Sequence, residues 1–145
     1  MEQYVHLRRA AFLMCGDWAL ADDLARTTMA RVRTEPDVAD PDLWAYADLM
    51  AAFKKHRGRR EHVFVAPRAA ATSGDSVHTV LVLDALHGLA PRCRAVLVLR
   101  HFCGLAIDET ADALDLDDSR VLAFEAEGLG AFAGLLATAR PAGVR

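Results

Sequence analysis

The chain has 145 residues, of which 53% are hydrophobic and 26% are charged. These values exclude a mostly disordered chain, a collagen-like chain and a small disulfide scaffold, and they suffice for one ordinary domain or two small ones. No stretch approaches about 18 uninterrupted apolar residues, so we predict no membrane span. The formal net charge of −3 argues weakly against nucleic-acid binding, but it averages over unequal parts of the chain.

The charge divides the chain into two parts. Residues 1–61 hold ten basic and ten acidic residues, whereas residues 77–137 hold four basic and nine acidic ones. Residues 62–76 contain Pro, Gly, Ser and a run of alanines, which is typical of a linker. Because the apolar periodicity is helical throughout, we predict an all-α protein. Its first module is 1–61, its second module is 77–137, and residues 138–145 form a tail.

No motif for catalysis, phosphate binding or metal binding is evident. Cys93, His101 and Cys103 could be imagined as metal ligands, but their spacing matches no zinc pattern. We interpret these cysteines, with Cys15, as free thiols in a reducing cytoplasm. Acidic pairs such as Asp108–Glu109 lie at helix starts and assemble with no nucleophile. The prediction is a cytoplasmic protein without enzymatic activity, metal or cofactor.

Three helices are predicted in the first module. One covers 4–15, and a second runs from Trp18 to about Arg33 with Asp17 as its N-cap. The third begins at Asp40–Pro41, a cap followed by proline at the first helical position.

A basic run ends this third helix. It allows two interpretations, a solvated helix end whose charges suit the dipole, or a patch that contacts phosphates. The bases in question are Lys54, Lys55, Arg57, Arg59 and Arg60.

The second module has the layout of a helix-turn-helix. A helix from 77 is followed by one that has Pro91 in its first turn and stops at Gly104. Two short helices then follow, 105–116 and one starting near 118, the latter capped by Asp117 or Asp118. Taken alone, this pattern also fits an ordinary helical hairpin.

Read together, these segments resemble the extracytoplasmic-function sigma factors of bacteria, the short actinobacterial kind. The first module carries LRRAAFLMCGDWALADDLARTT at 7–28, which resembles sigma region two. The second carries LHGLAPRCRAVLVLRHFCGL at 86–105 and IDETADAL at 107–114, which resemble region four. The resemblance implies RNA polymerase core and promoter DNA as partners, and an anti-sigma factor as a further one. It implies polymerase contacts by Asp22, Asp23, Leu24 and Arg26, and DNA contacts by the basic run and Arg120.

The second helix of the helix-turn-helix departs from the family pattern. Where the family has Lys, Ser, Gln and Arg, this chain has Leu122, Ala123, Phe124 and Glu127, and residues 104–137 hold one base and eight acids. Such a helix is repelled by DNA. Leu122, Phe124 and Leu129 are therefore core residues or a partner-binding face. Three glycines predict that the helix is short or is held by packing on another protein.

Two functions follow from these observations. The first is a sigma factor that directs transcription initiation. The alternative is a degenerate sigma-like protein that has lost minus-thirty-five reading and regulates transcription by binding proteins.

Overall fold

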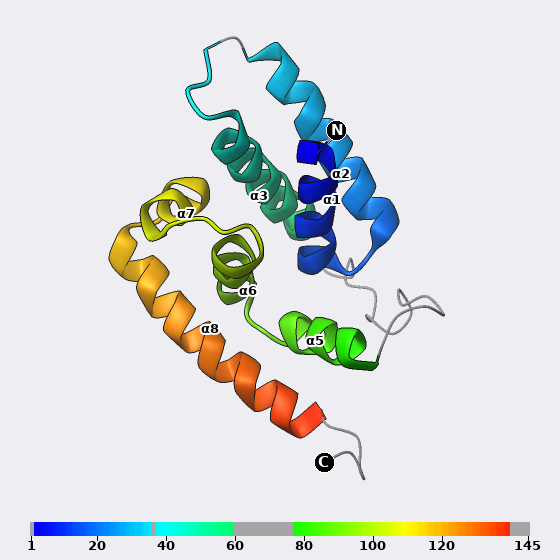
Figure 1. The fold of residues 1–145 in the computed structure, drawn as a ribbon, viewed down its shortest axis with the longest axis vertical. Helices are drawn as coiled ribbons and strands as arrows, with labels where there is room; N and C mark the ends of the chain where they lie inside the picture. The colour runs from blue at the N-terminus through cyan, green and yellow to red at the C-terminus, as the bar shows by residue number, and fades with distance from the viewer. Residues whose placement is uncertain (1, 36, 60–76, 140–145) are drawn as a thin grey trace.

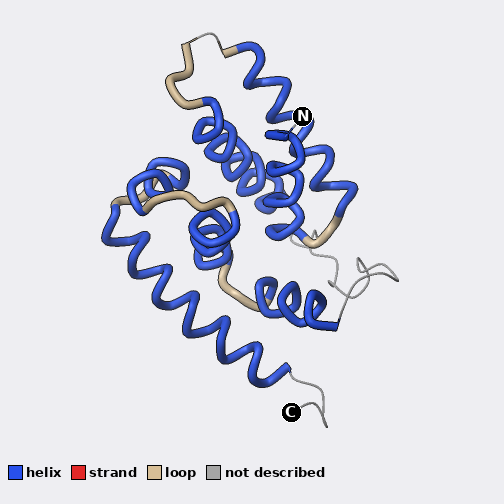
Figure 2. The backbone as a smooth tube through the Cα atoms, viewed as in Figure 1, coloured by secondary structure: helices blue, strands red, loops and turns tan. Residues whose placement is uncertain are grey.

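The computed structural model describes residues 2–35, 37–59 and 77–139. Within these ranges every regular element is helical, which confirms the all-α fold class (Figures 1 and 2). The predicted linker and Arg60 lie outside the described residues. The helices are α1 (Glu2–Cys15), α2 (Trp18–Thr34), α3 (Pro41–Arg59), α5 (Val77–His87), α6 (Pro91–Leu97), the π-helix η1 (Val98–Phe102), α7 (Ile107–Leu114) and α8 (Asp118–Ala139).

Local capping sets most of the helix boundaries. The Asp17 carboxylate accepts hydrogen bonds from the N–H groups of Ala19 and Leu20, so Asp17 is the N-cap predicted for α2. Pro41 begins α3 and Pro91 begins α6, because proline has no N–H to lose in the first turn.

The helix-turn-helix layout is present in α7 and α8. The N–H of Ala106 donates to Glu109 Oε1 at 2.8 Å at the start of α7, and Asp115 adopts φ 55° in the turn. The cap of α8 is Asp117, whose carboxylate accepts from the Arg120 N–H at 2.8 Å. This bond and one from the Ser119 hydroxyl lower the pKa of Asp117.

α8 is longer than its glycine content predicts. It has 22 residues and reaches Ala139, two residues into the predicted tail. Gly128 lies against α6, where an added Cβ would come within 3.2 Å of the Cys93 Cβ and 3.3 Å of Leu97 Cγ. The glycine thus lets two helices approach closely, and packing offsets its low helix propensity.

The two modules pack together through one hydrophobic core. Buried residues of α1–α3 form a single cluster with Leu83, Ala95, Val98, Leu99 and Leu105 of the second module. Figure 1 shows α6 between the first module and α8. The described parts of the two modules therefore share one hydrophobic core.

Arg94 joins the same two modules by hydrogen bonds. Its side chain is buried, and its guanidinium donates to the carbonyl of Met14 in α1 at 2.8 Å. The same group donates to the carbonyls of Leu86 and His87 at the end of α5, and to that of Leu89 just after it. His87 Nε2 also lies 3.0 Å from the Leu13 carbonyl, and burial lowers the pKa of His87 to about 4.

Candidate protein and nucleic-acid interfaces

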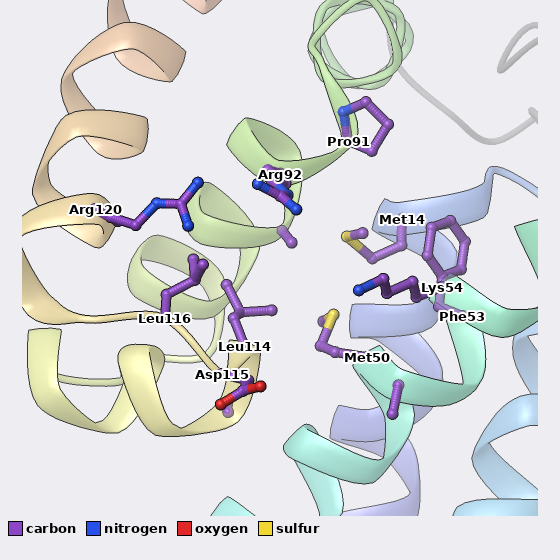
Figure 3. Close-up of a pocket in the computed structure, with 13 residues that line it drawn as sticks. Met14, Met50, Phe53, Lys54, Pro91, Arg92, Leu114, Asp115, Leu116 and Arg120 are labelled. Atoms are coloured by element: carbon purple, nitrogen blue, oxygen red, sulfur yellow. The ribbon is translucent and has the colours of Figure 1, made fainter.

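A cleft of about 500 Å³ lies between the two modules (Figure 3). Met14 of α1 and Met50 and Phe53 of α3 line one side. Leu114 and Leu116 line the other, around the helix-turn-helix. The cleft therefore offers apolar surface from both modules, and it exists only because they pack together.

Basic side chains surround this apolar surface. Lys54 of α3, Arg92 of α6 and Arg120 of α8 line the cleft, against a single acid, Asp115. Figure 3 shows Lys54 and Arg92 on facing sides of the cleft. The cleft thus combines apolar side chains with three basic ones. Such a surface is complementary to an amphipathic segment that carries acidic residues.

Phe124 is half-buried inside the second module, behind two of the basic residues that line the cleft. Its ring packs against two hydrophobic clusters of the second module. The guanidinium carbons of Arg92 and Arg120 lie 5.9 and 5.8 Å from the ring centroid, within cation–π range. The sequence predicts that Leu122, Phe124 and Leu129 are core residues or a partner-binding face. Of these, Phe124 packs against the core of the second module. Leu122 and Leu129 are 52% and 45% exposed.

The predicted polymerase residues on α2 do not all face solvent. Asp22 pairs with Arg26 Nε at 2.9 Å and lies 3.5 Å from Arg8 Nε, while Asp23 is exposed. Leu24 is 7% exposed and belongs to the shared core, so it offers little surface to a partner in this structure. It is buried because the inner face of α2 packs on α1 and α3.

The predicted DNA-binding residues lie in two places. Lys54 lines the cleft and Lys55 is exposed beside it at the end of α3. Arg57 and Arg59 lie in the last turn of the same helix, and their side chains, like Arg60, are outside the described residues. Arg120, on α8, also lines the cleft, although it is far in sequence from the basic run at the end of α3.

The Asp48 side chain of α3 is engaged within the first module. Its carboxylate accepts from the Thr28 hydroxyl at 3.0 Å and pairs with Arg31 Nη1 at 3.0 Å. These bonds tie α2 to α3. Tyr46 of the same segment is half-buried next to Cys103, and burial raises the pKa of both groups.

The cysteines show no metal-site geometry. In the described parts of the chain, no group of three His, Cys, Asp or Glu side chains could hold a metal ion. The Cys93 thiol donates to Glu127 Oε2 at 3.3 Å, and His101 Nε2 lies 3.2 Å from Glu125 Oε2.

Sequence reasoning missed Arg94 and the cleft residues Met50, Phe53 and Arg92. For Arg94 a signal exists, since an arginine between Cys93 and a run of apolar residues on one helix must be buried with partners. No local signal exists for the cleft, because its two sides come from segments far apart in sequence.

Part of the second module matches a known family model. Residues 79–121, from α5 to the start of α8, match the family model for Sigma-70, region 4. No curated protein matches the chain.

Two solved structures share the whole fold. One is the co-crystal structure of the sigma factor RpoE in complex with the anti-sigma factor NepR from Bartonella quintana. It is 17% identical, with a TM-score of 0.76 over 96% of this chain and 94% of that chain. The other is the PhyRSL–NepR complex from Sphingomonas sp. Fr1, 21% identical, with a TM-score of 0.66 over 96% and 87%. This chain therefore contains a Sigma-70 region 4 segment within the fold seen in the structure of the sigma factor RpoE.

Proposed function

We propose that this protein is a cytoplasmic sigma-factor-like regulator of transcription initiation that acts by binding proteins and has no catalytic activity of its own. The observation that carries the proposal is the cleft between the modules, which is apolar inside and bordered by Lys54, Arg92 and Arg120. Its ligand is an amphipathic segment of an anti-sigma factor. The two similar solved structures support this, since both are complexes with NepR.

The outer face of α8 supports the loss of minus-thirty-five reading. A recognition helix needs basic or amide side chains that reach the base edges of the major groove. Here Leu122, Ala123 and Ala126 are exposed on that helix, and Arg120 is in contact with the Phe124 ring. RNA polymerase core remains a partner in this proposal, through Asp22, Asp23 and Arg26 on α2.

The second candidate function is a sigma factor that still directs initiation. Lys54 and Lys55 at the end of α3 favour it, because two adjacent cations on one helix end can contact promoter phosphates together with the rest of the basic run.

One pair of charge reversals separates these candidates. Lys54→Glu changes the cleft wall, whereas Lys55→Glu makes the same charge change one residue away, outside the cleft. Because like charges across an interface cost several kcal/mol, we expect Lys54→Glu to weaken capture of the acidic partner at least ~10-fold. Lys55→Glu should leave it unchanged. The measurement is affinity capture from the native cytoplasm with quantitative mass spectrometry. Equal weakening by both variants would mean that the partner does not bind in the cleft, and would leave the second candidate.

A further inference from the structure

α8 carries an apolar face that nothing in the described structure covers. Val121 and Gly128 are buried against the rest of the second module, but another face of the same helix looks outward. By length and hydropathy, α8 is also the one helix among the described residues that could cross a membrane, although only 11% of its apolar window is buried. The residues that form this outer seam are the exposed Leu122, Ala126, Leu129 and Ala133 and, at its C-terminal end, the half-buried Leu136.

The outer seam has the spacing of a coiled coil. Leucines recur every seven residues at 122, 129 and 136, and alanines recur every seven at 126 and 133. Alternating steps of four and three residues place the two sets at the d and a positions of a heptad. The flanking e positions are Ala123, Gly130 and Ala137, all exposed, so the backbone of a second helix can approach closely.

We propose that the outer seam binds the same seam of a second copy, and that the two α8 helices pair antiparallel. In this arrangement the a positions of one helix face the d positions of the other. Leu122 then meets Ala133 of the second copy, and Leu129 meets Ala126 of the second copy. Each leucine fills the space left by a small residue, so the surface is complementary to itself. Such a pair is isologous and closes at two copies.

The charges of α8 permit this pairing. Of its two acids beyond the first turn, Glu125 binds Arg100 Nε at 2.9 Å and Glu127 accepts from the Cys93 thiol. Both are therefore engaged within their own module, and Glu125, which borders the seam at a g position, is held by Arg100. Antiparallel helices also place opposite dipole ends side by side. A duplex or an anionic lipid surface fits less well, because both need cations that the seam lacks.

The contact area between the two α8 helices predicts a weak dimer. A helix of this length rises about 33 Å, and a contact strip about 11 Å wide covers roughly 360 Å² per copy. The total of roughly 720 Å² lies below the roughly 1,200 Å² at which stable interfaces begin. We therefore expect a weak, reversible dimer. The pairing covers the face that a duplex would need, so dimerisation and major-groove reading exclude each other.

Sedimentation equilibrium of the full chain from 1 to 500 µM tests the proposal. Leu129→Glu places a charge at the centre of the seam, and we expect the dissociation constant to rise at least ~100-fold. Ala131→Glu is the matched control, since it adds the same charge at an exposed position on the same helix away from the seam. It should dimerise like the wild type. Far-UV circular dichroism shows whether both variants are folded.

Cysteine pairs test the antiparallel register. A mixture of Ala126→Cys and Leu129→Cys should cross-link between the two variants, above the level of the wild type with its native thiols. A parallel pair would cross-link in each variant alone and contradict the register. A chain that stays monomeric to 500 µM, or whose seam instead binds vesicles containing phosphatidylglycerol or a different protein, overturns the proposal. So does a dimer that Leu129→Glu leaves intact.

Discussion

Replacing Arg94 with methionine is expected to lower the free energy of unfolding by about 4 kcal/mol or more. The side chain is 2% exposed, and its guanidinium donates to four backbone carbonyls in α1 and at the end of α5. Methionine fills similar volume but leaves those buried carbonyls without this donor, and each buried polar group that loses its partner costs about 1–3 kcal/mol. Against a total stability of about 5–15 kcal/mol, such a loss removes roughly a quarter to four-fifths of the free energy of unfolding.

Arg92→Met is the control for this experiment. Arg92 lies on the same helix, two residues away, and is exposed. Its replacement removes a cation near the Phe124 ring, which is worth about 0.5–1 kcal/mol at exposed sites. Urea unfolding followed by circular dichroism measures both variants. Similar small losses for the two arginines would show that Arg94 does not hold the modules together.

Leu99→Ala should destabilise both modules at once. Leu99 lies in η1 of the second module, is fully buried, and belongs to the cluster that contains residues of α1–α3. Removing its isobutyl group leaves a cavity, and such changes cost about 2–5 kcal/mol. Both tryptophans of the chain, Trp18 and Trp44, are in the first module. Their fluorescence therefore reports on the first module when the second is altered.

We expect the fluorescence and circular dichroism transitions of Leu99→Ala to shift together to lower urea concentration. Leu122→Ala makes the same chemical change at a side chain that is 52% exposed, and it should shift the midpoint little. A fluorescence transition that stays in place while the circular dichroism transition splits would mean that the modules unfold separately, contrary to a shared core.

Much of the local structure could be predicted because it depends on local chemistry. Asp17 caps α2 with its own carboxylate, Pro41 and Pro91 begin helices, and Gly104 adopts φ 72° after η1. Each of these signals acts within a few residues, so the sequence pattern contains it.

The remaining features depend on contacts between distant segments. Whether Leu24 or Phe124 is exposed is decided by the helices that pack on it, and periodicity does not specify which face that will be. The length of α8 is decided in the same way, because Gly128 is tolerated only where α6 lies close. The hydrogen bond from Arg94 to Met14 joins residues 80 positions apart, and the cleft likewise joins segments that are distant in sequence. No window of sequence contains such a contact.

The central claim is that the helix-turn-helix of this protein presents its second helix to proteins and not to a duplex. Titration of the full chain against labelled duplexes from upstream of its own operon tests this most directly, with fluorescence anisotropy at 50 and 200 mM salt. We expect only weak binding, in the range of about 10⁻⁴–10⁻⁶ M that is typical of non-specific contacts, and no change with Arg120→Ala. Sequence-specific binding at about 10⁻⁸ M or tighter, lost with Arg120→Ala, would contradict the claim.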